Sequence, residues 1–122
     1  RVRSSAASDV YKRQIYKAVR ERFGERFYVT TSTENLVEVT MRGCDKGDAL
    51  VFFAEWAGVP LKNTIAIGDN INDLPMIRRA GLGVAVSNGD AALRKEAGFV
   101  TRSCDEDGVG YVIRKYGLGE EL

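Results

Sequence analysis

Two aspartates and an asparagine follow a short apolar stretch in residues 65–73, IAIGDNIND. The apolar stretch predicts a buried parallel strand, and ligands of open α/β sheets collect at the carboxyl ends of such strands. Gly68 permits a sharp turn, and Pro75 suits only the first turn of a helix, so a helix should begin near Asp73. We therefore expect Asp69 and Asp73 on a short loop at the end of the strand.

This loop has the chemistry of a cation and phosphate site. Asp69 and Asp73 are close enough in sequence to face one hard cation, and Mg²⁺ usually takes one or two carboxylates and completes its shell with water and phosphate. Aspartate and asparagine also favour turns and helix caps, so Asp73 is also a candidate N-cap. The loop alone leaves both interpretations open.

A lysine begins the helix that we expect upstream of this loop. Apolar residues at helical spacing predict a helix over residues 46–56, with Asp45 as its N-cap and Lys46 in its first turn. A cation at this position opposes the helix dipole, at a cost of up to about 1 kcal/mol when exposed. Most single lysines are solvated surface residues, but a local misfit of this kind also suggests a functional role.

Several motifs of the chain resemble the carboxyl-terminal half of haloacid dehalogenase superfamily phosphatases, in their Cof-like branch. The matching features are Lys46, the run Gly68-Asp69-Asn70-Ile71-Asn72-Asp73, Met76, and residues 80–89, 97–101 and 107–110. Their order and spacing agree over about residues 37–116. The resemblance implies a Mg²⁺-dependent hydrolase of small phosphate monoesters, with sugar phosphates as the expected substrates.

The resemblance also implies a role for individual residues. Asp69 corresponds to a Mg²⁺ ligand, and Asp73 supports the same metal site. Asn72 corresponds to a contact with the substrate phosphoryl group, and Lys46 to the lysine that bridges phosphate and nucleophile. Lys46, Asp69 and Asp73 are thus the expected catalytic residues. These roles suit phosphoryl transfer, which depends mainly on positioning and on neutralising charge.

The nucleophile motif of that family has no counterpart in residues 1–122. The family carries it as an apolar strand ending in Asp-x-Asp-Gly-Thr, and the first aspartate accepts the phosphoryl group. A similar sequence occurs at Asp105-Glu106-Asp107-Gly108, but polar residues precede it where the family has an apolar strand. We therefore interpret Asp105 as part of a helix start. We expect the nucleophile in a segment outside this sequence, and we expect residues 1–122 alone to be inactive.

Composition excludes several other classes of function. The net charge of +1 gives no reason to expect nucleic acid or a membrane surface as partner, and no apolar run approaches the roughly 20 residues of a membrane span. The chain has no histidine, which excludes histidine-dependent triads and most zinc sites. Cys44 and Cys104 are too few for a disulfide framework, which fits a reducing cytoplasm. The expected partner is a small-molecule phosphate ester.

The order of elements predicts an α/β protein with a three-layer, Rossmann-like parallel sheet and a remnant of an α+β cap at the amino terminus. Residues 1–13 are expected to be a non-native or disordered edge, residues 14–42 the end of the cap, and residues 43–122 the carboxyl-terminal part of the hydrolase core. Helices are predicted over residues 14–23, 46–56, 73–80, 90–97 and 109–116, and strands over 26–31, 36–41, 64–67, 84–86 and 99–101. Phe52, Phe53 and Trp56 are expected in the core.

Three alternatives to a phosphatase remain at this point. A phosphomutase of the same superfamily shares the core, and residues 1–122 by themselves suit a non-catalytic module that binds phosphate or Mg²⁺. A response-regulator receiver domain also has acids at strand ends, but it requires its lysine after them. Here Lys46 precedes Asp69.

Overall fold

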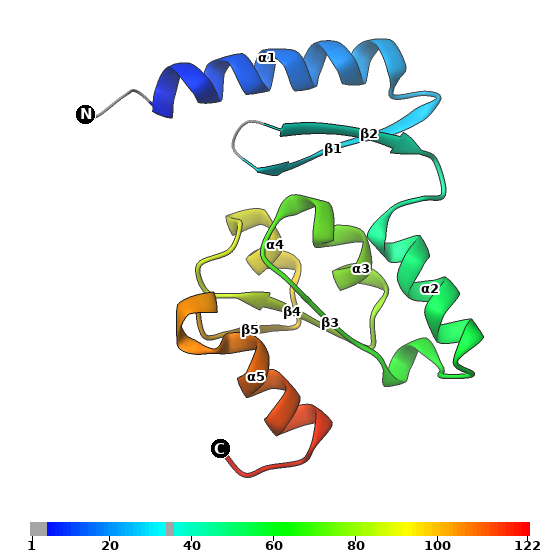
Figure 1. Cartoon of the computed structure of the whole chain (residues 1–122), viewed down its shortest axis with the longest axis vertical. Coiled ribbons are helices and arrows are strands. Elements are labelled where there is room, and N and C mark those ends of the chain that lie inside the picture. The colour runs from blue at the N-terminus through cyan, green and yellow to red at the C-terminus, as the bar shows by residue number, and fades with distance from the viewer. Residues whose placement is uncertain (1–4, 34–35) are drawn as a thin grey trace. The chain divides into compact units, whose positions relative to one another are not determined.

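The computed structural model describes residues 5–33 and 36–122, which belong to two compact units, Arg1–Asp45 and Lys46–Leu122. The first unit contains helix α1 (Ser5–Phe23) and the antiparallel strands β1 (Phe27–Thr33) and β2 (Leu36–Met41). Helix α1 packs against both strands (Figure 1). The rings of Phe23 and Phe27 are in edge-to-face contact, with 6.4 Å between their centroids. The predicted helix and hairpin are both present.

Helix α1 begins at Ser5 rather than at residue 14. Residues 5–13 contain alanine, lysine and arginine and lack glycine and proline, so a helix nucleated downstream can propagate through them. Helix α1 thus includes residues 5–13, which the sequence analysis expected to be a non-native or disordered edge, and residues 1–4 lie outside the described part of the chain. The basic residues Arg20 and Arg22 occupy the last turn, where they complement the helix dipole.

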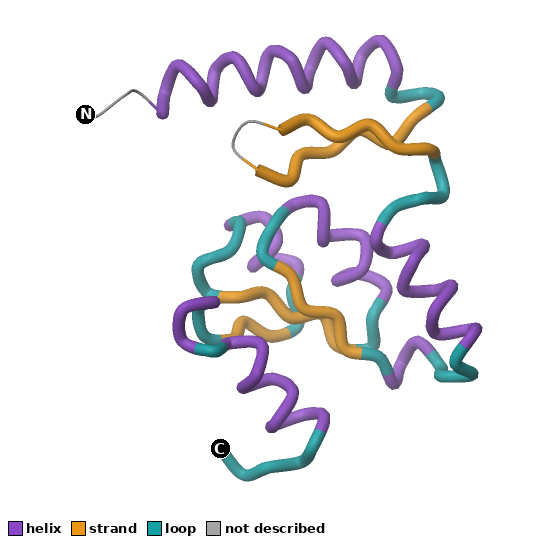
Figure 2. Tube along the Cα trace, viewed as in Figure 1, coloured by secondary structure: helices purple, strands orange, loops and turns teal. Residues whose placement is uncertain are grey.

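The second unit alternates helices with the strands of a parallel sheet, which confirms the predicted fold class. The helices are α2 (Lys46–Trp56), α3 (Leu74–Arg79), α4 (Ala91–Glu96) and α5 (Gly108–Val112), and a π-helical turn, Ile113–Gly117, continues α5. The strands β3 (Ile65–Gly68), β4 (Leu82–Val86) and β5 (Phe99–Thr101) lie in the order β3-β4-β5 (Figures 1 and 2). Short 3₁₀ turns at Leu61–Asn63, Ile71–Asp73 and Cys104–Glu106 connect them.

Helices cover the two faces of this sheet in layers. Helices α3 and α4 pack on β4, and the buried cluster Ala66, Ile77, Ala85 and Leu93 lies between them and the sheet. Helix α5 packs against β5 (Figure 1). Side chains alternate between the faces of a strand, so Val84 and Val86 point away from the Ala85 cluster, and both are almost fully buried. Burial of both faces explains why these strands are continuous apolar runs.

The predicted burial of the α2 aromatic residues is wrong. Phe52, Phe53 and Trp56 are 63%, 61% and 80% exposed, whereas Ala54 is buried and Leu50 packs against the core. An α-helix turns by about 100° per residue, so Leu50 and Ala54 share one face while Phe52 and Trp56 lie on the opposite one. The aromatic residues have helical spacing, but they do not share the face that meets the core.

Candidate functional site

The site is built at the point where β3 ends and the chain turns toward α3. A Cβ atom at Gly68 would lie 2.5 Å from Cβ of Asp73 and 2.7 Å from its Oδ2. Such distances are below any normal contact, so only glycine allows the Asp73 carboxylate to lie against the end of the strand. The glycine that precedes the two aspartates in the sequence is thus required for a steric reason, because a side chain at this position would overlap Asp73.

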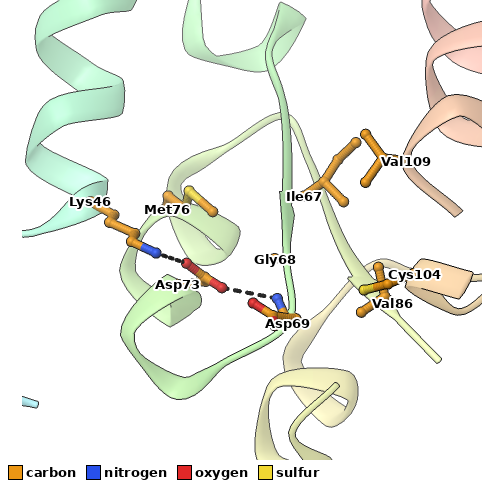
Figure 3. Close-up of a pocket in the computed structure, with 9 residues that line it drawn as sticks. All are labelled: Lys46, Ile67, Gly68, Asp69, Asp73, Met76, Val86, Cys104 and Val109. Atoms are coloured by element: carbon orange, nitrogen blue, oxygen red, sulfur yellow. Dashed lines mark hydrogen bonds and ion pairs between the residues drawn. The ribbon is translucent and has the colours of Figure 1, made fainter. Parts of the chain in front are cut away.

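Asp73 organises the loop through its carboxylate. Its Oδ2 accepts hydrogen bonds from the amides of Asp69 at 2.9 Å and Asn70 at 3.0 Å. Its Oδ1 forms an ion pair with Nζ of Lys46 (Figure 3). The Asp73 residue is only 2% exposed. Both carboxylate oxygens are therefore engaged by the chain itself.

These contacts determine the ionisation of Asp73. Burial alone would raise the pKa of its carboxyl group, but the hydrogen bond from Lys46, the two amide hydrogen bonds and the positive charge of Lys46 together hold the pKa below its ordinary value of 3.8. Asp73 is therefore a carboxylate at neutral pH, as an ion pair with Lys46 requires.

Close packing of two helices brings Lys46 to this carboxylate. A Cβ atom at Gly47 would lie 2.7 Å from the carbonyl oxygen of Pro75, so glycine at this position allows α2 to approach the start of α3. Arg79 of α3 also forms an ion pair with Asp48 of α2. The side chain of Lys46 is 50% exposed, so it remains accessible to solvent while it is paired with Asp73.

Asn70 rather than Asp73 caps the turn after the strand. The Asn70 side chain accepts a hydrogen bond from the amide of Ile71 at 2.8 Å, and Asn70 and Asp73 together form a capping box around the 3₁₀ turn Ile71–Asp73. Asp73 precedes α3 but makes no side-chain cap to it. The capping role of Asn70 escaped the sequence interpretation, although asparagine is among the preferred N-cap residues.

Three of the four predicted site residues meet in one pocket. Lys46, Asp69 and Asp73 line it, together with the apolar residues Ile67, Met76, Val86 and Val109 and the thiol of Cys104 (Figure 3). Asn72 is absent from this lining, and its Oδ1 atom is buried with no hydrogen-bond partner among the described residues. The pocket therefore places a cation and an exposed carboxylate, Asp69, on either side of the buried Asp73.

The donor set of this pocket fits a hard cation with few protein ligands. Within residues 5–33 and 36–122, no group of three or more histidine, cysteine, aspartate or glutamate side chains is arranged to enclose a metal. Mg²⁺ does not require such a cage, because it retains several waters and takes one or two carboxylates with substrate phosphate. Asp69 is suited to this role, since it is exposed at the strand end while Asp73 is engaged elsewhere.

Hydrogen bonds also connect the loops that follow the three strands. The amide of Asp90 donates to the carbonyl oxygen of Asp69 at 2.7 Å, and the amide of Cys104 donates to Oδ1 of Asn88 at 3.1 Å. The sequence interpretation did not identify Asn88. The one feature of the sequence that points to Asn88 is its place as a polar residue shortly after an apolar strand.

Known proteins resemble this chain in both sequence and structure. Residues 5–113 match the family described as haloacid dehalogenase-like hydrolase. The chain is 38% identical over 90 residues to the 5-amino-6-(5-phospho-D-ribitylamino)uracil phosphatase YcsE of Bacillus subtilis, an alignment that covers 74% of this chain and 36% of that protein.

Two solved structures extend the comparison. A haloacid dehalogenase-like hydrolase from B. subtilis has a TM-score of 0.78 and 33% identity, over 83% of this chain and 36% of its own. The subclass IIB sugar phosphatase BT4131 has a TM-score of 0.80 and 25% identity, over 87% of this chain and 40% of its own. The chain thus spans less than half the length of these relatives. The match over residues 5–113 and the shared parallel sheet together show that this chain belongs to the haloacid dehalogenase-like hydrolases.

Proposed function

We propose that the complete protein is a Mg²⁺-dependent phosphatase that hydrolyses small phosphate monoesters. The observation that carries this proposal is the ion pair of Lys46 with Asp73 beside the exposed Asp69, in one pocket at the end of β3. The names of the relatives support it, since they include several phosphatases and one sugar phosphatase. Sugar phosphates are therefore the substrate class to test first.

In the proposed mechanism the chain's residues position and neutralise the phosphoryl group. Lys46 directs its ammonium group toward the phosphoryl oxygens, where it acts as a mobile point charge. Mg²⁺ bound through Asp69 would neutralise further charge on the same oxygens. Asp73 holds the Lys46 ammonium and the Asp69 amide in place. The proposed contact of Asn72 with the phosphoryl group rests on the family resemblance, because Asn72 does not line the pocket. Most of the catalytic effect is then electrostatic preorganisation.

The nucleophile in this proposal is an aspartate outside residues 1–122. It would attack the phosphorus atom while the ester P–O bond breaks, so that the substrate alcohol leaves and an aspartyl-phosphate forms. Water would then hydrolyse the aspartyl-phosphate, which regenerates the carboxylate and releases inorganic phosphate. Both carboxylates of the pocket already have other roles, Asp73 as the partner of Lys46 and Asp69 as the metal ligand. We further propose a cytoplasmic location, which is supported by the two exposed, unpaired thiols of Cys44 and Cys104.

Two other functions share the same pocket. A phosphomutase would use the same lysine and metal ligand but would transfer the phosphoryl group between substrate hydroxyls without releasing phosphate. A non-catalytic module would bind phosphate or Mg²⁺ without turnover, and this is the expected behaviour of residues 1–122 alone. Release of inorganic phosphate by the complete protein separates the phosphatase from both.

Steady-state kinetics of the complete protein test the site. Lys46→Ala and Asp69→Ala should each lower kcat/KM by an amount equivalent to about 3 kcal/mol or more, comparable with the loss of an oxyanion donor. Lys46→Arg should not restore activity, because a planar guanidinium cannot take the position of an ammonium. Asn72→Ala should mainly raise KM. Arg94→Ala, in an exposed residue of α4, is the control and should leave the kinetics unchanged. Wild-type kcat/KM in Lys46→Ala would refute the proposed site.

Residues 1–122 alone provide a second test. They should hydrolyse p-nitrophenyl phosphate no faster than background, because no aspartyl nucleophile is proposed within them. In the structure, Asp105 belongs to the 3₁₀ turn Cys104–Glu106 and does not line the pocket. Mg²⁺-dependent turnover that Asp105→Asn abolishes would show that Asp105 is the nucleophile after all.

A further inference from the structure

Lys46 lies at the beginning of a helix, where the backbone is less restrained than in a helix interior. It is the first residue of α2 and also the first residue of the second compact unit. Helix ends fray, and the side chain of lysine is a flexible four-carbon stem with a charged end. The place that the Lys46 ammonium group can reach therefore depends on what holds the first turn of α2.

Three consecutive residues of this turn contact the segment around α3, which lies beside α2 (Figure 1). In chain order the contacts are Lys46 with Asp73, Gly47 with Pro75, and Asp48 with Arg79. The first and third contacts are ion pairs, and the second is the close approach to the Pro75 carbonyl oxygen described above. The first turn of α2 thus meets the α3 segment at three points within the second unit.

The ion pair of Asp48 and Arg79 has favourable surroundings. Its side chains are 28% and 39% exposed, against 45% for Glu96 and 56% for Arg78 in the ion pair between α4 and α3. Charges that are less exposed are screened less by salt. Asp48 lies in the first turn of α2 and Arg79 in the last turn of α3, where each charge complements its helix dipole. Since ion pairs that stay partly exposed contribute little to overall stability, we expect a local effect on the first turn of α2.

We propose that the ion pair of Asp48 and Arg79 positions Lys46 for its contact with the substrate phosphoryl group. The pair restrains the first turn of α2, and the position of this turn determines where the Lys46 ammonium group lies relative to Asp73. Asp48 and Arg79 are positioning residues, because neither lines the pocket. The kinetic consequence rests on the proposed function, which gives Lys46 its role at the phosphoryl group. The restraint of α2 itself does not depend on that function.

Two neighbouring arginines of α3 provide a matched comparison in the complete protein. Arg79→Gln removes the ion pair with Asp48, whereas Arg78→Gln removes the ion pair with Glu96 of α4. Both substitutions remove one charge from the last turn of the same helix. Arg79→Gln should lower kcat by about fivefold and change KM by less than about twofold, because a displaced ammonium group weakens mainly the transition state. Arg78→Gln should leave both constants within about twofold of the wild type, because its ion pair joins α3 to α4. Equal kinetic constants for the two variants would overturn the proposal.

Combined substitutions show whether the effect passes through Lys46. Asp48→Asn should lower kcat as much as Arg79→Gln does, and the two together should lower it no more than either alone, because each removes the same ion pair. In a Lys46→Ala background, Arg79→Gln should lower kcat no further. A loss of the same size in that background would show that Arg79 acts by another route and would overturn the proposal.

Hydrogen exchange of the complete protein measures the restraint without reference to activity. In an α-helix each amide donates to the carbonyl oxygen four residues earlier, so the amides of Leu50 and Val51 report on the first turn of α2. Arg79→Gln should accelerate their exchange by about threefold, because the turn loses one of its contacts with α3. Arg78→Gln should leave their exchange at the wild-type rate. The same exchange rate in both variants would contradict the restraint.

The two measurements separate this proposal from the proposed function. A wild-type protein that releases no phosphate, together with faster exchange in Arg79→Gln, would refute the phosphatase and support the restraint of α2. Wild-type kcat in Arg79→Gln of an active phosphatase would overturn the positioning role and leave the proposed function intact.

Discussion

The ammonium group of Lys46 and the carboxylate of Asp73 form an ion pair between residues 27 positions apart in the sequence. The Asp73 side chain is almost fully buried, with 3% exposure, while that of Lys46 is 50% exposed. This asymmetry explains the unfavourable placement of a cation in the first turn of α2, since the buried carboxylate compensates for the helix dipole. It also leaves half of the Lys46 side chain accessible, as the proposed contact with a phosphate requires.

Replacement of Asp73 should remove a pH-dependent contribution to stability. Asp73→Asn should lower the free energy of unfolding at pH 7 by about 2 kcal/mol, because charged hydrogen bonds to Lys46 and two amides are weakened. The folded-state pKa lies below 3.8, so between that pKa and 3.8 the unfolded state binds more protons. The contribution is thus complete above pH 3.8 and is lost as the pH falls through the folded-state pKa.

Urea denaturation across this pH range measures the effect. The wild type and Asp73→Asn should differ by a constant amount near neutral pH and converge in acid. Asp105→Asn, in an exposed residue, serves as the control. A difference that persists unchanged below the folded-state pKa would show that Asp73 does not act through its charge.

Two glycine substitutions should differ in their effect on stability. Gly68→Ala forces a Cβ atom to within 2.5 Å of Asp73 and should lower the free energy of unfolding by about 1–3 kcal/mol, as overpacking typically does. Gly98→Ala meets its nearest neighbours at 3.6 Å, an ordinary contact, and should remain within about 0.5 kcal/mol of the wild type. Denaturant titration of both variants makes the comparison, and equal stability would contradict the steric role of Gly68.

Magnesium should bind residues 1–122 weakly and at Asp69. Among the residues that the structure describes, Asp69 is the one carboxylate at the strand end that is free to coordinate, so the affinity should be low. In a Mg²⁺ titration followed by ¹⁵N chemical shifts, perturbations should centre on residues 68–73 and disappear in Asp69→Asn. Perturbation of residues 105–107 with Asp69 silent would place the cation elsewhere.

Lys115 should stabilise the packing of α5 and its π-helical turn against strand β5. Its Nζ lies 5.6, 5.5 and 5.4 Å from the ring centroids of Phe99, Tyr111 and Tyr116, and it donates a hydrogen bond to the Tyr111 hydroxyl at 3.3 Å. That hydrogen bond and the electrostatic attraction of both tyrosines raise the pKa of Lys115 above its ordinary value. Lys115→Met should lower Tm, because it removes the cation but retains the length of the side chain.

The control for this experiment is Lys95→Met, in an exposed residue of α4. It should leave Tm unchanged. Equal Tm values for the two variants would mean that the ammonium group of Lys115 does not stabilise the packing of the three rings.

The sequence was most informative where local pattern and tertiary environment agree. Helix α2 and strand β5 have the predicted bounds, because the helical spacing of Leu50 and Ala54 and the short apolar run before Arg102 each match a buried face. Asp69 was placed correctly at a strand end by the glycine before it. Lys46 and Asp73 lie in the same pocket as Asp69, while the roles of all three remain predictions.

Other features depend on contacts that local pattern does not contain. The exposure of Trp56 follows from its face of α2, and the start of α1 at Ser5 is compatible with residues 5–13, which contain no glycine or proline. The engagement of Asp73 by Lys46 requires the close approach of α2 and α3 at Gly47. The π-helical turn at Ile113–Gly117 has no composition signal, since its residues also suit an α-helix.

The hydrogen bonds among the strand-end loops have an entropic consequence for any ligand of Asp69. The Asp69 carbonyl oxygen is held by the Asp90 amide, and Asn88 holds the Cys104 amide on the neighbouring loop. A loop that is already ordered loses little conformational freedom when it binds, so less of the interaction energy is consumed in freezing the backbone. The rim of the pocket is thus preorganised by hydrogen bonds of main-chain groups, while the Asp69 carboxylate itself stays uncommitted within residues 5–33 and 36–122.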